Sequence, residues 1–383
     1  MKQGWEHKKL GSYIKEYSVK NKLSEEIPVY SVTNSQGFCK DYFGKEVASQ
    51  DKSTYKIVPY GFFAYNPSRI NVGSIDWQSK EDRVIVSPLY NVFSVSSDLM
   101  QQYLLYYLKS PATIHYIDSI ATGTVRLNLK LSLLKEFILP IPSLSTQEKI
   151  VSELDKINEL IRLKKEQLKD YDNLAQSIFY EMFGDPVENE KEWEVKKIGD
   201  LAIVKTGPFG SMLHKEDYIT DGIPLVNPIH MKNFKIVPDM EFTISKEKAC
   251  ELENYMLQNN DVVFARRGDI GRCAIVSEIE KGYLCGTGSL FVRFTEDIES
   301  VFIMYIIRSE SFSKHLVSKA KGATMLNINS NTIADLEIPL PPLPLQHLFA
   351  QRIEQIERQK SAVQKSITDL ETLLASRMQY WFE

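Results

Sequence analysis

The sequence of 383 residues contains little cysteine, and its four cysteines form no C-x-x-C pair. None of the six histidines stands at metal-ligand spacing from a cysteine. Structural zinc sites need closely spaced ligands and disulfide scaffolds need many cysteines, so neither explains the fold. We predict no metal site, and reduced, buried thiols at Cys39, Cys250, Cys273 and Cys285.

Long apolar runs are also lacking. No run approaches the roughly 18 residues that would span a bilayer, and residues 1–5 lack the apolar stretch of a signal peptide. Hydrophobic residues make up 43% and charged residues 25% of the chain, as in ordinary soluble globular proteins. We expect a cytoplasmic protein without membrane contact.

Several catalytic motifs are absent. There is no G-x-x-x-x-G-K-[ST] phosphate loop and no H-E-x-x-H, and Gly286-Thr287-Gly288 does not continue into a dinucleotide fingerprint. The Asn-Pro pairs that begin at Asn66 and Asn227 lack the second proline and aromatic residue of an adenine methyltransferase motif. The sequence therefore predicts a chain that binds and does not catalyse.

The sequence does contain an internal duplication, in which residues 83–183 recur at a constant offset of 199 residues. Matched pairs include Tyr106 with Tyr305, Gly123 with Gly322, Asn128 with Asn327, Pro140 with Pro339 and Gln147 with Gln346. Residues 5–11 also resemble residues 193–199, but at an offset of 188. The second copy therefore contains a net 11 additional residues before the shared region.

Each copy is predicted to be one globular domain followed by one long helix. Short strand-like runs, such as residues 90–95 and 290–294, mix with helical segments such as residues 99–108, which indicates the α+β class. The predicted segments are a first domain at 1–143, a first helix at 144–186, a second domain at 187–342 and a second helix at 343–383.

The net charge of −4 argues weakly against nucleic acid as a partner. The charge is unevenly distributed, however, because residues 144–190 carry 6 basic and 11 acidic side chains, whereas residues 1–143 carry 17 basic and 13 acidic ones. Acidic groups are therefore most concentrated in the first helix, which leaves room for basic clefts on the domains.

Both long helices carry apolar residues at alternating steps of four and three, which is typical of a coiled-coil seam. The first is predicted to begin at a capping box from Ser145 to Glu148 and to end at Gly184. The predicted seam residues are Ile150, Leu154, Ile157, Ile161 and Leu168 in the first helix and Phe349, Ile353, Ile356, Val363, Ile367 and Leu370 in the second.

The polar breaks in the two seams fall at different places, since Lys164 corresponds to Val363 and Lys360 to Ile161. This difference favours pairing between the two helices of one chain, and homodimerisation through either helix is the alternative. The first helix leads from one domain to the start of the other, so an antiparallel return would give a rod. This rod would carry a domain at each end and a pseudo-two-fold axis across its middle.

Loops that combine glycine with arginine, lysine and asparagine are the candidate DNA-binding segments. Arginine and asparagine make bidentate hydrogen bonds to guanine and adenine, and glycine lets the backbone approach phosphate. Each loop alone is more simply interpreted as a turn with solvated charges. The candidate residues are Asn66, Arg69, Asn71 and Arg126 in the first copy, and Lys205, Ser211, His214, Lys215, Arg266, Arg267, Arg272 and Lys321 in the second.

The matched residues Asn128 and Asn327 follow a glycine-bearing turn just before the proline-rich helix start of each copy. We interpret their side chains as caps of the local backbone and not as DNA contacts. Arg126, two residues before Asn128, is a candidate phosphate contact.

The whole chain resembles the specificity subunit of Type I restriction-modification systems. The resemblance rests on the Trp-Glu-x-x-Lys-[Leu/Ile]-Gly motifs at residues 5–11 and 193–199, on Phe264-Ala265-Arg266-Arg267-Gly268, on the proline-rich junctions at 138–142 and 338–342, and on Gln147 and Gln346. One departure is that the second helix start has Pro344 and His347 where the first has Ser145 and Glu148.

This resemblance implies two target recognition domains, each of which reads one half of a bipartite sequence in double-stranded DNA. It also implies two methyltransferase subunits and separate restriction subunits as partners. Those partners would use S-adenosylmethionine, ATP and magnesium, while this chain would bind no cofactor. Two alternatives remain: a two-domain scaffold that binds protein ligands, and a stand-alone DNA-binding regulator.

Overall fold

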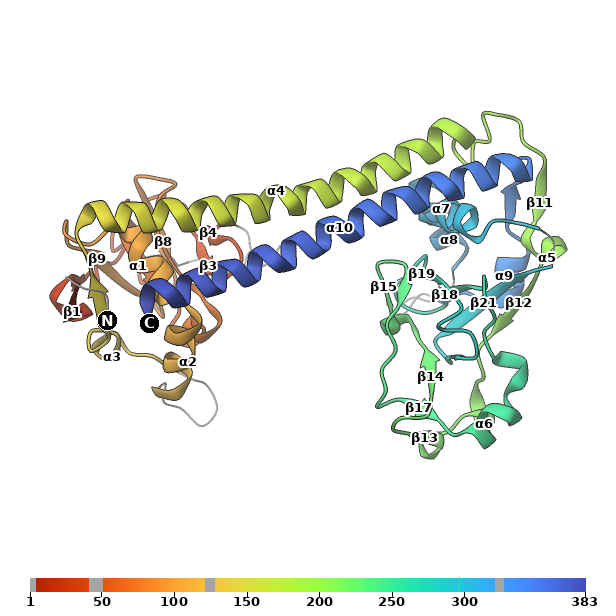
Figure 1. The fold of residues 1–383 in the computed structure, drawn as a ribbon, viewed down its shortest axis with the longest axis horizontal. Coiled ribbons are helices and arrows are strands. Elements are labelled where there is room, and N and C mark those ends of the chain that lie inside the picture. The colour runs from red at the N-terminus through yellow and green to blue at the C-terminus, as the bar shows by residue number, and fades with distance from the viewer. Residues whose placement is uncertain (1–4, 41–50, 121–127, 296, 321–326) are drawn as a thin grey trace. The chain divides into compact units, whose positions relative to one another are not determined.

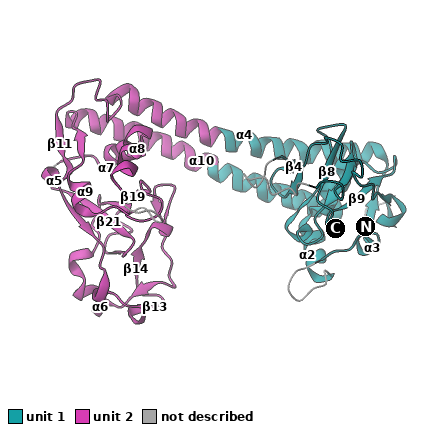
Figure 2. Cartoon of the chain, turned by 180° about the vertical axis from the view of Figure 1, so that it is seen from behind, with its two compact units in different colours: residues 1–166, 364–383 teal, residues 167–363 magenta. Residues whose placement is uncertain are grey.

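The computed structural model describes residues 5–40, 51–120, 128–295, 297–320 and 327–383. The chain divides into two compact units (Figures 1 and 2). The first unit comprises the chain up to Glu166 together with Gln364–Glu383, and the second comprises Gln167–Val363. Each unit contains one globular domain and one half of each long helix.

In the first unit, a series of short strands is followed by three short helices, one further strand and the first part of a long helix. They are β1 (Glu6–Lys9), β2 (Ile14–Glu16), β3 (Ser31–Thr33), β4 (Gly37–Cys39), β5 (Lys56–Pro59), β6 (Phe63–Tyr65), β7 (Ile75–Trp77), β8 (Arg83–Val86), β9 (Asn91–Val95), α1 (Gln101–Leu108), α2 (Pro111–Ile120), α3 (Leu131–Leu134), β10 (Ile138–Ile141) and the first part of α4 (Leu144–Phe183).

The second unit repeats this order with additional short strands. Its elements after α4 are β11 (Val195–Lys197), α5 (Ile198–Leu201), β12 (Ala202–Thr206), β13 (Tyr218–Ile219), β14 (Ile223–Val226), β15 (Met231–Lys232), β16 (Lys235–Ile236), β17 (Thr243–Ile244), α6 (Lys246–Glu251), β18 (Val262–Ala265), β19 (Cys273–Ile275), β20 (Leu284–Cys285), β21 (Ser289–Phe294), α7 (Ser300–Arg308), α8 (Glu310–Lys319), α9 (Ser330–Ala334), β22 (Glu337–Pro339) and α10 (Leu343–Phe382).

The two domains share two of their sheets. Each has a four-stranded antiparallel sheet, ordered β2-β9-β6-β7 in the first unit and β12-β21-β18-β19 in the second. Each also has an antiparallel strand pair next to the long helix, β1 with β10 and β11 with β22. The predicted α+β class and duplication are therefore confirmed. The second unit has β13–β17 and α6 between its first two sheet strands in sequence, which is where the additional residues lie.

The two long helices run antiparallel to each other within each unit. In the first unit Lys165 bonds to Glu371 (Nζ to Oε1, 2.8 Å), and Glu153, earlier in α4, pairs with Arg377, later in α10. In the second unit Lys360 donates to Asp172 (Nζ to Oδ1, 2.8 Å). The antiparallel pairing predicted from the sequence is thus observed within the chain.

The start of α4 differs from the predicted capping box. The helix begins at Leu144, and the carbonyl of Ser143 accepts from the backbone N–H groups of Thr146 and Gln147, each at 2.9 Å. Ser145 and Glu148 both lie inside the first turns and line a groove described below. The predicted box was wrong because the helix begins at Leu144, one residue before Ser145, so that Ser143 and not Ser145 directly precedes the first turn.

Nine of the eleven predicted seam residues are buried, and the other two are half-buried. The buried ones are Ile150, Leu154, Ile157, Ile161, Phe349, Ile353, Ile356, Val363 and Ile367, and the half-buried ones are Leu168 and Leu370. Toward each domain the seam merges with the domain core. In the second unit Phe179 and Phe349 are fully buried and their ring centroids lie 5.7 Å apart, next to Tyr305.

A buried glutamine connects each long helix to its domain. The side chain of Gln147 accepts from Met100 N–H at 2.9 Å and donates to the carbonyls of Asp98 and Pro142, both at 3.0 Å. Gln346 repeats the arrangement, since it accepts from Glu299 N–H at 3.2 Å and donates to Pro341 at 2.8 Å. The shared glutamines therefore fix the helix start against the N-terminus of α1 or α7.

Replacing Gln147 with alanine should lower the free energy of unfolding of the first unit by about 2–4 kcal/mol, because buried backbone groups lose their partners. Chemical denaturation would measure this loss of free energy, and hydrogen exchange of the α1 amides would assign it to the first unit. Gln364→Ala is the matched control, since Gln364 is exposed on α10. Equal stability of the two variants would contradict the assigned role.

Three of the cysteines are buried, as predicted, but Cys250 is exposed on α6, so the prediction for that thiol was wrong. Burial raises the pKa of Cys273 to about 12. Among the described residues, no cluster of three or more His, Cys, Asp or Glu side chains is placed to hold a metal ion. No helix in the described part of the chain has the length and apolarity needed to cross a membrane.

Candidate nucleic-acid interface and helix grooves

The two arginine-bearing loops occupy equivalent places in the two domains. The first lies between β6 and β7, and the second lies between β18 and β19. In the first domain Leu129 N–H donates to the carbonyl of Pro67 at 3.0 Å, and in the second Ile328 N–H donates to that of Arg266 at 2.9 Å. Both donors and both acceptors are 199 residues apart, so the repeat includes these loops.

In the second unit the arginine loop joins two segments that the sequence motifs had not marked as sites. Arg266 N–H donates to the carbonyl of Gly288 at 3.1 Å, and Gly288 N–H donates to the side chain of Asn227 at 3.2 Å. Glycine is required at position 286, because a Cβ there would lie 2.3 Å from Asn227 Oδ1. In the sequence these segments stand out only as incomplete enzyme motifs, at Asn227 and at residues 286–288. Their contacts join residues too distant in sequence to be predicted.

The three arginines of this loop have different surroundings. Arg272 is half-buried and held by its neighbours. Its Nε and Nη2 bind Asp269 Oδ2 at 3.0 and 2.7 Å, and its Nη1 donates to the carbonyl of Pro228 at 3.2 Å. Arg266 is half-buried, and its Nε donates to Asn327 Oδ1 at 3.4 Å. Arg267 is exposed.

The surroundings also affect the charge of Arg266. Two effects lower the pKa of the Arg266 guanidinium. Burial is the larger, and repulsion from the neighbouring Arg267 is the second. Guanidinium groups remain protonated at physiological pH even so. The lowered pKa therefore indicates a cation that is partly removed from water and would gain from an additional acceptor.

The sequence predicts that Asn327 caps the local backbone. Residues 321–326, which precede it, lie outside the described residues. Among the described residues, the Asn327 side-chain oxygen accepts from Arg266 Nε. The matched Asn128 is exposed. Arg126 and Lys321, both candidate DNA contacts, lie outside the described residues.

Four further candidates in the second domain lie along β12 and the segment that follows it. Lys205 and Ser211 line a hollow of about 480 Å³ together with Asn254 and Tyr255. The ammonium of Lys205 donates to the carbonyl of Asn254 at 3.4 Å and lies 5.7 Å from the centroid of the Tyr255 ring. His214 and Lys215 are exposed on the next turn.

In the first domain, the candidates Asn66, Arg69 and Asn71 share the loop between β6 and β7. Asn66 and Asn71 are half-buried and Arg69 is exposed. Gly73 closes the loop with φ +80°, and a Cβ there would lie 2.4 Å from Asn34 Oδ1. No motif in the sequence indicates Asn34, which reaches the loop from the turn between β3 and β4.

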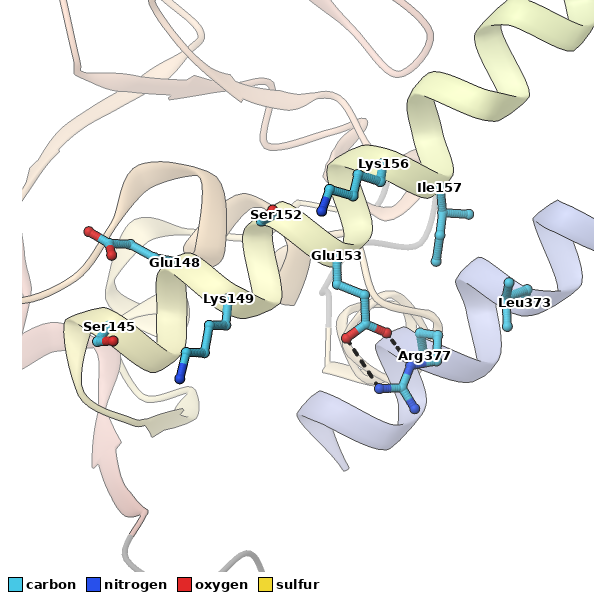
Figure 3. A pocket seen from close by; sticks show the side chains of 9 residues that line it. All are labelled: Ser145, Glu148, Lys149, Ser152, Glu153, Lys156, Ile157, Leu373 and Arg377. Atoms are coloured by element: carbon cyan, nitrogen blue, oxygen red, sulfur yellow. Dashed lines mark hydrogen bonds and ion pairs between the residues drawn. The ribbon is translucent and has the colours of Figure 1, made fainter.

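Each unit also has a groove along the paired long helices. The first is about 760 Å³ and is shown in Figure 3, and the second is about 410 Å³. Five lining positions of the first groove correspond to positions of the second at the 199-residue offset: Glu153 to Arg352, Lys156 to Gln355, Ile157 to Ile356, Leu373 to Leu174, and Arg377 to Ile178. The matched leucines Leu373 and Leu174 are 45% and 47% exposed. The duplication therefore extends to a pair of surface grooves with exposed apolar residues.

The grooves differ in the number of charged residues that line them, five in the first and one in the second. In the first, Arg377 binds Glu153 through Nε and Nη2 (Figure 3). The indole N–H of Trp381 donates to the same carboxylate at 3.1 Å. The pair raises the pKa of Arg377, mainly through its hydrogen bond to Glu153. In the second, Arg352 contacts the sulfur of Met182 at 3.8 Å.

A double-mutant cycle with Glu153→Ala and Arg377→Ala should give a coupling energy of about 1 kcal/mol, at the upper end for a partly exposed, bidentate pair. Added salt should reduce the coupling, because mobile ions screen it. The more exposed pair Arg162 and Glu166 on α4 is the control and should show less coupling. A coupling as small as that of the control would contradict a structural role for the pair.

The sequence pattern of the family described as "Type I restriction modification DNA specificity domain" matches residues 3–170 and 190–372. The Type I restriction enzyme MjaIX specificity subunit of Methanocaldococcus jannaschii is 24% identical over 291 residues, which cover 72% of this chain and 66% of that protein. The MjaVIII specificity subunit of the same organism is 22% identical over 296 residues, 71% of this chain and 68% of that protein. The chain thus spans about two thirds of the length of these curated relatives.

Solved structures show a similar fold. A chain from a study titled as the structural basis of complex assembly and conformational transition of the type I R-M system aligns with a TM-score of 0.65. It is 18% identical, and the alignment covers 99% of this chain and 97% of that one. The S subunit of a Type-I restriction-modification system from M. genitalium aligns with a TM-score of 0.53 at 13% identity, over 100% and 98% of the two chains.

Proposed function

We propose, because this chain belongs to the family of Type I restriction modification DNA specificity domains, that it recognises a bipartite DNA sequence with one half-site read by each domain. The observation that carries this proposal is the repeated loop, held by the same backbone bond in both domains but with different side chains. Two different half-sites require loops that are positioned alike but carry different side chains, because the side chains at the base edges determine sequence preference.

Phosphate contacts would come from the exposed cations of the candidate set. Arg69, Lys215 and Arg267 are exposed, and such residues supply the affinity that depends on salt. Arg272, which is bound to Asp269, would instead brace its loop against the segment at Pro228. This assignment separates the residues that position the loops from those that contact DNA.

The two matched grooves are an argument for the binding of two copies of one partner protein. Matched exposed leucines at Leu373 and Leu174 offer the same apolar anchor twice, and burial of such side chains drives association. We assign these grooves to two methyltransferase subunits, which would bind S-adenosylmethionine and act on DNA selected by this chain. Restriction subunits that use ATP and magnesium would complete the system, and we place this system in the cytoplasm.

The decisive experiment maps methylated adenines in the genome of the host with and without the gene, and then repeats the mapping after residues 191–342 are replaced by those of another family member. We expect the methylated sequence to contain two half-sites and only one of them to change after the exchange. If both half-sites changed, independent reading by the domains would be refuted.

Two further measurements separate the alternatives. A protein-binding scaffold would show no DNA affinity that falls with salt, whereas the proposed protein should show a steep fall. A stand-alone regulator would bind its site but would not co-purify with a methyltransferase. Absence of both DNA binding and methyltransferase binding would overturn the proposed function.

A further inference from the structure

The loop between β18 and β19 places two adjacent arginines in opposite situations. Arg266 is half-buried and tied by Nε to Asn327, and its backbone is fixed at both ends by Gly288 and Ile328. Arg267 is exposed, and Gly268 after it has φ +76° with open space where a Cβ would be. One side chain is therefore pre-oriented, and its neighbour is free to adjust beside an accessible backbone.

Orientation determines what an arginine can recognise. A guanidinium whose Nε is already bonded still has both terminal nitrogens, and these match the O6 and N7 acceptors of guanine. Holding that group in place before binding reduces the entropy lost on contact. An exposed, adjustable arginine is suited to phosphate, which tolerates many approach directions and carries no sequence information.

We propose that Arg266 reads a guanine in the half-site of the second domain, that Asn327 positions it, and that Arg267 contacts phosphate. This proposal rests on the proposed function and names one base and one residue within it. Partial desolvation of Arg266, which lowers its pKa, agrees with a cation placed to bind an acceptor in a closed contact.

The first domain supplies an internal comparison. Its residue at the equivalent position is Pro67, which has no hydrogen-bond donor in its side chain. The arginine of that loop, Arg69, instead corresponds to Gly268 and is exposed. Recognition of guanine by Arg266 should therefore be confined to the half-site of the second domain. Recognition of the other half-site should not depend on the side chain of Pro67.

The test uses the full chain and duplexes that contain the target found by methylation mapping. In one duplex at a time, a guanine of the second half-site is replaced by 7-deazaguanine, which lacks the N7 acceptor. We expect one position at which this change weakens binding by about 10-fold or more. Arg266→Lys should weaken binding to the unmodified duplex by roughly 10- to 100-fold, and 7-deazaguanine at that position should then add little.

Three variants serve as comparisons. Arg267→Ala should weaken binding to target and unrelated DNA alike and should reduce the salt slope by about one. Asn327→Ala should reduce discrimination at the same guanine only, and Asn327→Asp, which keeps an acceptor for Nε, should restore it. A purely structural Asn327 would change binding to all sequences equally.

If the Arg266→Lys variant still distinguished guanine from 7-deazaguanine as well as the unaltered chain does, at every guanine of the second half-site, the inference would be overturned. The proposed function would remain intact. Loss of discrimination in the first half-site would also overturn it. By contrast, failure of the unaltered chain to prefer its target over unrelated DNA would count against the proposed function. The two failures are therefore distinguishable in one series of duplexes.

Discussion

Phe179→Ala should lower the free energy of unfolding of the second unit by about 3–5 kcal/mol, the range for large buried aromatic side chains. Phe179 is fully buried, and its ring lies near Phe183, Phe302, Tyr305 and Phe349, with centroid distances of 5.4–6.1 Å. These neighbours come from α4, α7 and α10. Removal of the ring would therefore leave a cavity where three helices meet.

The effect should appear as a loss of about 6–20 °C in the melting temperature of this unit. Hydrogen exchange in α7, followed by mass spectrometry, would assign the loss to the second unit. Leu174→Ala is the matched control on the same helix, because Leu174 is 47% exposed and should cost at most about 0.5 kcal/mol. An equal loss in both variants would show that Phe179 is not the centre of this core.

Deletion of residues 364–383 should destabilise the first unit by about 5 kcal/mol or more, which is comparable with the whole stability of a domain. This segment contributes Met378 to the core of the first domain. It also carries Phe382, whose ring centroid lies 5.3 Å from that of Tyr103, and Trp381, which stacks on Trp5 at 6.1 Å. The first domain therefore loses part of its core and not only a helix partner.

In the truncated chain, the backbone amides of α1 should lose their protection from hydrogen exchange, whereas those of α7 in the second unit should remain protected. Removal of Glu383 alone, which lies beyond the end of α10, is the control and should leave both protected. Protected α1 amides in the chain that ends at Val363 would mean that the first domain is complete without α10.

The sequence predicted the repeat, the class and the long helices, because these depend on local patterns and on periodicity. The seam from Ile150 to Ile161 could be read directly from its spacing, and these side chains are buried. The loops of Arg69 and Arg266 lie before the matched region of each copy, and the structure extends the 199-residue offset to them, because the same backbone bond holds both loops. Repetition thus carried three-dimensional information that a single copy would not have supplied.

Contacts between distant segments could not be predicted in this way. Nothing near Asn227 indicates that its side chain binds Gly288, and nothing near Gln147 indicates that it reaches Met100. Such bonds depend on which strands become neighbours in the sheet, a property set by the whole chain. The exposed Cys250 was missed for a related reason, because cysteine is usually buried and only the placement of α6 exposes it.

The first unit is discontinuous in sequence, since it combines the chain up to Glu166 with Gln364–Glu383, whereas the second unit is continuous. During synthesis at about 5–20 residues per second, the ribosome would release the closing segment of the first unit roughly 10–40 s after Glu166. The domain that is translated first is therefore the last to be completed. A message cut short near codon 363 would yield a chain with a finished second domain and an unfinished first one.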